Sequence, residues 1–255
     1  MEGPTVDDVG NLYFSEIKRG GVHRLTPDGR TEVIVPDRVG VGGICLHAKG
    51  GLIASGVDLT HFHDRRRRLL VGLSEVPAKP GMAAIGFNDL HADRLGRVFV
   101  GVRRADGPGE LLRVSGAHEY EVVHGDLYPN GIALSPDGSA IYAVDMNRRR
   151  VLVLGDSPSS FSTEAVEGLP DGLVTDEEGF VWIAFYRGGC IARFDPSGSL
   201  ARLVEMPVDK PLSLCFGGPD RTDLYIVTGS NSTESGSIFV LPVEVPGTAV
   251  DIARI

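Results

Sequence analysis

The chain has 255 residues, of which 42% are hydrophobic and 23% charged, which is the composition of an ordinary globular protein. No apolar run approaches the ~18 residues that cross a membrane, and the first residues lack the basic and apolar regions of a signal peptide, so we expect a cytoplasmic protein without a membrane partner. The net charge of −9 argues against nucleic acid as a partner, and the three widely spaced cysteines fit neither a disulfide framework nor a CxxC zinc site.

One phrase recurs along the chain, a turn followed by an apolar, aromatic strand. The turn contains glycine in the first five copies, and Arg221-Thr222 takes its place in the sixth. The copies are DDVGNLYFSEI (7–17), HAKGGLIASGV (47–57), DRLGRVFVGV (93–102), SPDGSAIYAVD (135–145), DEEGFVWIAF (176–185) and GPDRTDLYIVT (218–228). Their spacing of about 40 to 46 residues is the period of propeller blades.

Further alternating strands accompany each copy, with D-G, P-D-G and S-G turns between them. The first unit supplies strands at 3–7, 11–17, 21–27 and 31–36, and the fifth at 172–176, 180–186, 190–196 and 199–207. We therefore predict an all-β protein, a six-bladed β-propeller with four antiparallel strands per blade, in a single domain over residues 1–255. A β-sandwich is the alternative, but it would not explain so regular a period.

Two segments bear on the edges of the ring. The basic run Arg65–Arg68 is interpreted as a solvated loop or as a charged edge that deters strand addition. The last unit contains four candidate strands of its own, at 212–216, 223–227, 237–243 and 249–255. Because the first unit already begins at Glu2, we expect either that the ring closes without strands interlocked from its two ends or that the chain is a shortened version.

Polar residues recur at one phase of the repeat, eight positions before the turn glycine. In four units this position holds Glu2, Asn88, Asn130 and Asp171; the second unit has Gly42, and alignment of the sixth turn places Ser213 there. Equivalent positions of a blade repeat lie around the same ring, and this one falls at the start of the innermost strand. We therefore expect the four polar side chains to converge near the axis at one mouth of the channel.

Two carboxylates and two amides, without Cys or His, form a hard oxygen cage. Such ligands suit Ca²⁺, which we prefer, and also Mg²⁺ or Mn²⁺ with waters in the remaining positions; Zn²⁺ stays open as a further divalent metal cation. The alternative interpretation is that N-G and D-G are simply turn dipeptides. Turns, however, do not require carboxylates and amides at a shared phase.

The phrases EGP, FNDL, YPNGIALSPDG, LPDGLVTDEEGFVWIA and LSLCFGGPDRTDLYIVT, in this order, resemble the SMP-30/gluconolactonase/luciferin-regenerating-enzyme-like family along nearly the whole chain. The resemblance implies a six-bladed propeller with a divalent metal in its channel and, in many members, lactonase activity. Carried over by motif, Glu2, Asn130 and Asp171 are expected metal ligands. Asn88 is expected to be a fourth ligand or a substrate contact, and Asp171 also the general base.

The sequence departs from the sugar-lactonase branch of this family around the N-D motif. Gly86 stands where that branch has Arg, and Leu90-His91 stand where it has Gly-Lys, closer to the drug-responsive lactonase branch. The missing Arg weakens the case for a sugar acid lactone.

Substrate contacts are then expected from other polar residues. Arg103, Arg104 and Asp106, just beyond the next strand, are the candidates, against the alternative that the two arginines are ordinary solvated loop residues. His91 is expected to line the pocket or to pack between blades, and Tyr128 to shape the pocket rim.

The leading hypothesis is a metal-dependent hydrolase that opens a lactone, with the ion as Lewis acid and Asp171 as general base or as nucleophile. No GxSxG motif supplies a serine nucleophile. Two alternatives remain: an organophosphate hydrolase with the same cage, and a non-catalytic scaffold that the metal stabilises. The sequence implies a small-molecule substrate, but it specifies neither that substrate nor the physiological metal, nor whether the protein is a monomer or a dimer.

Overall fold

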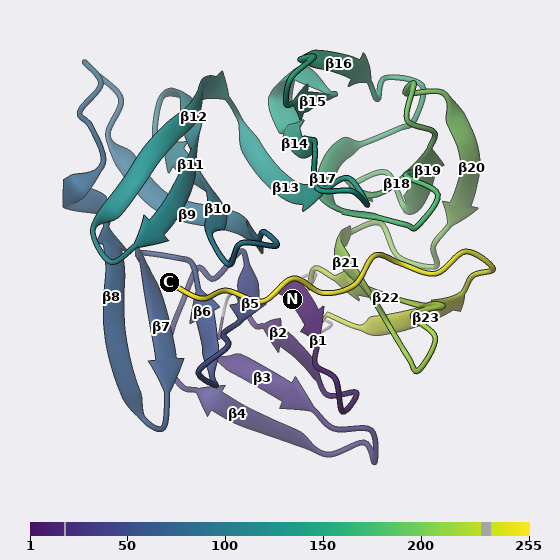
Figure 1. Cartoon of the computed structure of the whole chain (residues 1–255). Helices are drawn as coiled ribbons and strands as arrows, with labels where there is room; N and C mark the ends of the chain where they lie inside the picture. Colours follow the sequence, from purple (N-terminus) through teal and green to yellow (C-terminus); the bar gives the residue numbers. More distant parts are fainter. Residues whose placement is uncertain (18, 231–235) are drawn as a thin grey trace.

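The computed structural model describes residues 1–17, 19–230 and 236–255. Six antiparallel sheets lie as blades in a ring around a central axis (Figure 1). In each sheet the strands follow one another in chain order, and the first strands of neighbouring blades pack side by side around the hub. The predicted six-bladed β-propeller is therefore confirmed.

The first three blades are regular four-stranded sheets. Blade one contains β1 (Glu2–Val6), β2 (Leu12–Ser15), β3 (Val22–Leu25) and β4 (Thr31–Val35). Blade two contains β5 (Ile44–Leu46), β6 (Leu52–Ala54), β7 (Asp58–His63) and β8 (Arg66–Gly72), followed by the short 3₁₀ helix η1 (Leu73–Glu75). Blade three contains β9 (Ala84–Ala92), β10 (Val98–Arg104), β11 (Gly107–Gly116) and β12 (Glu119–Leu127).

The last three blades complete the ring. Blade four contains β13 (Pro129–Leu134), β14 (Ile141–Asp145), β15 (Arg150–Leu154) and β16 (Ser159–Ser162), with the 3₁₀ helix η2 (Met146–Arg148) between β14 and β15. Blade five contains β17 (Leu169–Thr175), β18 (Val181–Tyr186), β19 (Cys190–Phe194) and β20 (Leu200–Glu205). Blade six contains β21 (Pro211–Gly217), β22 (Asp223–Thr228) and β23 (Ile238–Pro242).

Three of the recurring turns, those beginning at Asp7, Asp93 and Asp176, have an Asp followed three residues later by Gly. Between β17 and β18, Asp176 accepts hydrogen bonds from the backbone N–H groups of Glu178 (3.1 Å) and Phe180 (3.0 Å). Gly179 adopts a φ of 83°, a left-handed conformation that favours glycine. The Asp side chain replaces missing backbone partners, so this phrase folds locally into a turn and fixes where the next strand begins.

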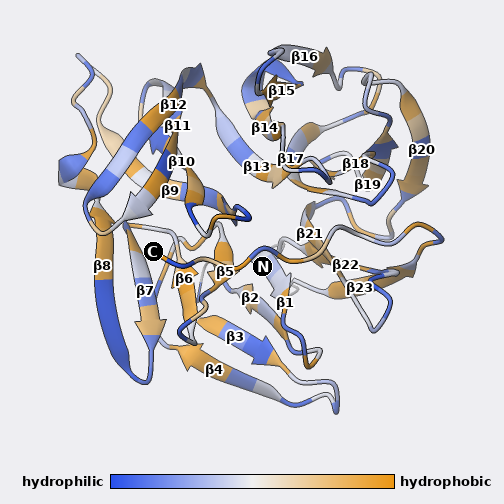
Figure 2. Cartoon of the chain, in the orientation of Figure 1, coloured by the Kyte–Doolittle hydropathy of each residue, from blue (hydrophilic) through white to orange (hydrophobic). Residues whose placement is uncertain are grey.

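The hydrophobic core lies between adjacent blades. The core of blades two and three includes Leu70 and Phe87, and that of blades five and six includes Trp182 and Leu224, all at most 2% exposed. Figure 2 shows apolar residues along the strands of every blade, whereas the outer strand β8 is hydrophilic where Arg66–Arg68 are exposed. That basic run therefore lies on an edge strand, as predicted.

Blade six has three strands among the described residues, and the expected fourth strand at 249–255 is not part of it. Figure 1 shows the C-terminal segment running across the hub instead. Ala253 is fully buried and exchanges backbone hydrogen bonds with Leu46 and Ala48, both at 2.9 Å. The prediction was wrong because Ala253 and Ile255 find an apolar partner in the core of blades two and three.

Ring closure uses no strand exchange among the described residues, as expected. Each sheet is built from one continuous segment, and β1 packs against β21. The amino group of Met1 donates a hydrogen bond to the carbonyl of Thr228 at 2.9 Å.

Two further expectations concern the interior and the membrane. Cys45, Cys190 and Cys215 are buried free thiols. No helix in the described part of the chain has the length and apolar character required to cross a bilayer.

Candidate metal and substrate site

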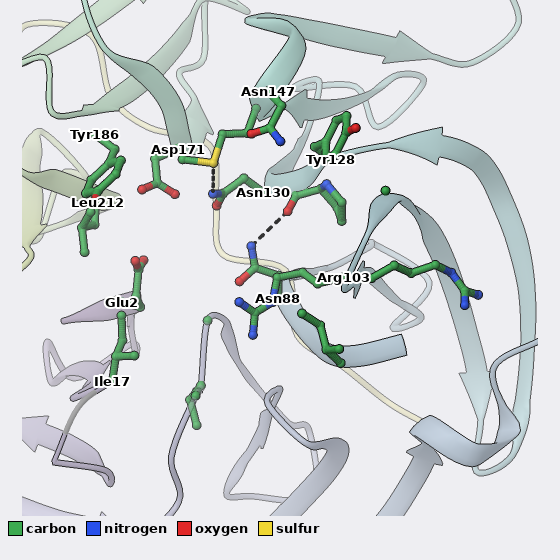
Figure 3. Close-up of a pocket in the computed structure, with 18 residues that line it drawn as sticks. Glu2, Ile17, Asn88, Arg103, Tyr128, Asn130, Asn147, Asp171, Tyr186 and Leu212 are labelled. Atoms are coloured by element: carbon green, nitrogen blue, oxygen red, sulfur yellow. Dashed lines mark hydrogen bonds between the residues drawn. The ribbon is translucent and has the colours of Figure 1, made fainter. Parts of the chain in front are cut away.

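The polar residues of the shared repeat phase lie at β-bulges in the innermost strands. The register slips between Glu2 and Thr5 in β1, between Pro129 and Ile132 in β13, and between Pro170 and Leu173 in β17. A bulge bends its strand and changes the direction of the side chains beside it. Figure 3 shows the result: Glu2, Asn88, Asn130 and Asp171 lie around one cavity at the hub.

Glycines allow the inner strands to approach closely enough for this convergence. A Cβ on Gly172 would lie 2.7 Å from the Cα of Ser213, and a Cβ on Gly131 would lie 2.5 Å from the backbone nitrogen of Leu173. Neither glycine has a positive φ, and both lie inside strands. The N-G and D-G pairs at 130–131 and 171–172 are therefore not turn dipeptides, and their glycines serve close packing between blades.

The cavity has a volume of about 430 Å³, a size typical of small-molecule sites. Besides the four polar residues it is lined by Tyr128, at the position expected for a rim residue, and by Tyr186. Apolar groups of Ile17, Val41, Ile85, Pro129, Met146 and Leu212 complete much of its wall. Trp182, in the same strand as Tyr186, is 2% exposed and belongs to the core.

The ionised forms of Glu2 and Asp171, at the base of the cavity, are electrostatically unfavourable without a compensating charge. Burial raises the pKa of Glu2 well above its usual value, and the nearby Asp171 and Asp89 raise it further, while the N-terminus and Arg103 lower it. Burial also raises the pKa of Asp171 well above its usual value, with a further contribution from Asp89, although a hydrogen bond with Asn130 lowers it. Buried like charges of this kind are costly unless a cation compensates them.

The amides are held by neighbouring groups. The side-chain nitrogen of Asn88 donates to the carbonyl of Pro129 at 3.0 Å, and that of Asn130 donates to the Sδ of Met146 at 3.4 Å. A Cβ on Gly42 would lie 2.5 Å from the Oδ1 of Asn88, so only glycine in blade two leaves room for this amide. Asn88 is thereby fixed with its oxygen near the hub.

This donor set fits a hard divalent cation. No three His, Cys, Asp or Glu side chains within the described ranges gather closely enough to hold a metal by themselves. Glu2 and Asp171 would therefore need the amide oxygens of Asn88 and Asn130, and water, to complete a coordination shell. Oxygen-only ligands with two carboxylates are what Ca²⁺ and Mg²⁺ accept.

Asp89 is a buried carboxyl group at the hub that sequence reasoning missed. It follows Asn88 in β9, is 7% exposed and lines a second cavity of about 90 Å³ further along the channel. Burial raises its pKa to about 7, although Arg103 lowers it. The signal was present in the FNDL motif, where the Asp stands next to the residue that was chosen.

Three expected positions lie outside the main cavity. Ser213 lines the second cavity, and Leu212 lines the main one at the position equivalent to Asp171. The reason is that the turn before β22 is longer than the turn before β18. Phe216 pairs with Leu224 across it, whereas Thr175 pairs with Val181. His91 also lines the second cavity, and burial lowers its pKa to about 4, although Asp93 raises it. Asp106 is exposed in the turn after β10 and is not among the cavity's lining residues.

The two arginines of β10 have different environments. The side chain of Arg104 is 1% exposed and donates to Glu110 (2.9 Å) and to the carbonyls of Met82 (2.6 Å) and Pro77 (2.7 Å). Arg103 is exposed and lines the cavity beside Asn88 (Figure 3). It lies opposite Gly86 in the β9–β10 pair. Arg104 therefore has a structural role, and Arg103 remains accessible.

Comparison with known proteins finds relatives that match most of this chain. A family described as "SMP-30/Gluconolactonase/LRE-like region" matches residues 1–230. The pentonolactonase XacC of Haloferax volcanii is 29% identical and covers 96% of this chain and 91% of its own length. The 6-deoxy-6-sulfogluconolactonase of Pseudomonas putida is 32% identical and covers 93% of this chain and 89% of its own length.

A solved structure supports the fold independently. The calcium-binding protein regucalcin from Agrobacterium tumefaciens superimposes with a TM-score of 0.86, covering 100% of this chain and 93% of its own, at 23% sequence identity. Together with the match over residues 1–230, the propeller shows that the chain belongs to the SMP-30/gluconolactonase/LRE-like family.

Proposed function

We propose that this protein is a divalent-metal-dependent hydrolase that opens the ring of a lactone. The observation that carries the proposal is a pair of carboxylates, the half-buried Glu2 and the buried Asp171, which face each other beside amide groups at the base of a small-molecule cavity (Figure 3). Two relatives that match nearly the whole chain are named as lactonases, which supports the same reaction class.

The residues proposed to hold the cation are Glu2, Asn88, Asn130 and Asp171. When bound, a divalent ion supplies Lewis-acid polarisation of the ester carbonyl and stabilises the negative charge that develops on its oxygen. We propose Ca²⁺, because the donors are oxygen atoms and because a structural relative is described as calcium-binding. Mg²⁺, Mn²⁺ and Zn²⁺ are the competing ions.

Asp171 is proposed as the group that handles the attacking water. As a general base its carboxylate accepts a proton from the water, whose oxygen bonds to the carbonyl carbon; the ring oxygen then leaves and becomes a hydroxyl group. As a nucleophile the carboxylate attacks the same carbon, and water then hydrolyses the resulting anhydride. Label in the Asp171 side chain after a single turnover in ¹⁸O-labelled water would establish the second route, because water enters that side chain only when it attacks the Asp171 carbonyl of the anhydride.

Other lining residues are proposed to orient the substrate. Tyr128 and Tyr186 present partly buried rings to the cavity, and Asn88 presents its amide oxygen. These groups stay neutral, so they can position a ring without disturbing the charge at the hub.

A panel of lactones and phosphotriesters, assayed with EDTA and then with each of the four ions, tests the proposal. Lactone turnover that EDTA abolishes and one ion restores is the expected result. Turnover of phosphotriesters alone would favour the organophosphate alternative. No turnover of any panel member with any ion would overturn the hydrolase proposal and leave the metal-stabilised scaffold.

A further inference from the structure

The guanidinium of Arg103 lines the candidate substrate cavity. Its charge lowers the pKa of Glu2 and of Asp89, but within the described part of the chain no hydrogen bond or ion pair of this side chain is present. Its neighbour Arg104 pairs with Glu110, and Arg148 near the same mouth pairs with Asp126 and Asp145. Of the arginines around the cavity, Arg103 alone therefore keeps its N–H donors available to a ligand.

Glycine at position 86 gives Arg103 its place. The two residues are directly opposed in the β9–β10 pair, and a Cβ on Gly86 would lie 3.1 Å from a terminal nitrogen of Arg103. A larger residue at position 86 would compete for this space. The guanidinium, which comes from β10, thus fills the space that a side chain at position 86 of β9 would occupy.

The cavity is electrically polarised by this arrangement. Glu2 and Asp171 lie at the hub, and Arg103 lies on the side formed by blade three (Figure 3). An exposed guanidinium with free N–H donors binds a carboxylate, sulfonate or phosphate through two parallel hydrogen bonds. The hub carboxylates repel such a group, so a ligand that carries one is oriented with its anion at Arg103 and its opposite end at the hub.

We propose that the substrates are lactones that carry an anionic substituent, namely a carboxylate, a sulfonate or a phosphate, and that Arg103 binds that substituent. The inference rests on the proposed lactonase function and adds to it the charge of the substrate. It also fixes the orientation, because the scissile ester lies at the carboxylate side of the cavity.

The test compares two lactones that differ only in charge, glucono-1,5-lactone and its 6-phosphate. The ratio of their kcat/KM values is measured for the natural protein, for Arg103→Gln and for Arg66→Gln, a matched charge control on the exposed edge strand β8. The natural protein is expected to prefer the phosphorylated lactone by about tenfold to a hundredfold, the range of one charge-assisted interaction. Arg103→Gln should lose most of this preference through KM, and Arg66→Gln should keep it.

A binding measurement keeps the inference separate from the reaction. Calorimetry with 6-phosphogluconate and with gluconate should show tighter binding of the phosphorylated acid, and Arg103→Gln should remove the difference. If the natural protein opens glucono-1,5-lactone but both variants retain the same substrate ratio, the inference about Arg103 is wrong and the lactonase proposal stands. If it opens no lactone, the lactonase proposal fails, and equal binding of 6-phosphogluconate by the natural protein and Arg103→Gln would overturn the inference as well.

Discussion

Glu2 and Asp171 come from blades one and five, yet their carboxylates face each other across the hub (Figure 3). Each raises the free energy of the ionised site, as the elevated pKa values of both groups indicate. Their strands are placed by the packing of the whole ring, so the repulsion is built into the fold and a cation is the simplest way to relieve it.

The first prediction is that a divalent cation stabilises the fold through Glu2. Adding Ca²⁺ to EDTA-treated protein should raise Tm, because an ion that binds only the folded state at 100 times its Kd contributes about 2.7 kcal/mol. Glu2→Gln should reduce this rise, since it removes one anionic ligand. Differential scanning calorimetry measures both.

Glu244→Gln is the matched control for this experiment, because Glu244 is exposed just after β23 and does not line the cavity. The Glu244→Gln variant should show the full Ca²⁺-dependent rise in Tm. The same Ca²⁺-dependent rise in Glu2→Gln as in the natural protein would contradict a metal site at the hub.

The second prediction contrasts two aspartates five residues apart. Asp171→Asn should lower kcat by at least about a hundredfold, since it removes the proposed base or nucleophile, while the metal-free fold keeps its stability because a repelled buried charge is lost. Asp176→Asn should instead destabilise the fold by roughly 3 kcal/mol, because Asp176 is fully buried and accepts from Trp182 (3.1 Å) and Arg193 (2.7 Å).

Urea unfolding and activity per folded molecule measure these two effects. Asp176→Asn should retain activity where it is folded. The scaffold alternative predicts the opposite for Asp171→Asn, a loss of stability with no change in any hydrolytic rate.

The third prediction concerns close packing at the hub. Gly172→Ala should lower both stability and activity, because its Cβ would meet the Cα of Ser213 in the next blade and displace the strand that carries Asp171. Gly125→Ala is the control, since nothing lies within 4 Å of its new Cβ. We expect a Tm loss of several degrees, on the order of 1–3 kcal/mol of overpacking strain, for Gly172→Ala only. Equal behaviour of the two variants would show that the hub can relax.

The fourth prediction is a pH effect from His91. Burial lowers its pKa in the folded protein to about 4, below the ~6.5 of an unfolded chain, so folding opposes protonation of this side chain. The stability that the neutral His91 contributes is fully present above about pH 6.5 and is lost as the pH falls toward 4. Between pH 7 and pH 5 the loss is on the order of 2 kcal/mol.

His91→Gln should flatten this pH dependence relative to the natural protein, as measured by urea unfolding at each pH. His63→Gln, which alters an exposed histidine, should leave the slope unchanged. A slope that persists in His91→Gln would assign the effect to other groups.

The fold was predictable because its signals are local. Each Asp-containing turn, such as that of Asp176 and Gly179, is fixed by neighbours within a few residues, so the repeat period could be counted directly. The same counting brought Glu2, Asn88, Asn130 and Asp171 to one cavity, since equal phase in a repeat means equal position in a ring.

The residues whose positions were not predicted depend on features that a count of repeat positions does not include. Ser213 was displaced because the sixth turn is longer, and Leu212 took its place. Asp89 was overlooked because it stands one position after the shared repeat phase, which was the only phase counted. The path of residues 249–255 depends on a partner in another blade, which no local pattern can specify.

The segment at 249–255 also has a consequence for the order of assembly. His47 and Ile255 form a hydrogen bond although 208 positions separate them in the chain, whereas each sheet pairs only with its own neighbours in sequence. Contacts of large sequence separation form slowly, because the entropy of closing a long loop opposes them. The strands within each blade can therefore pair early, and joining blade two to the far end of the chain is expected to be the late step that sets the folding rate.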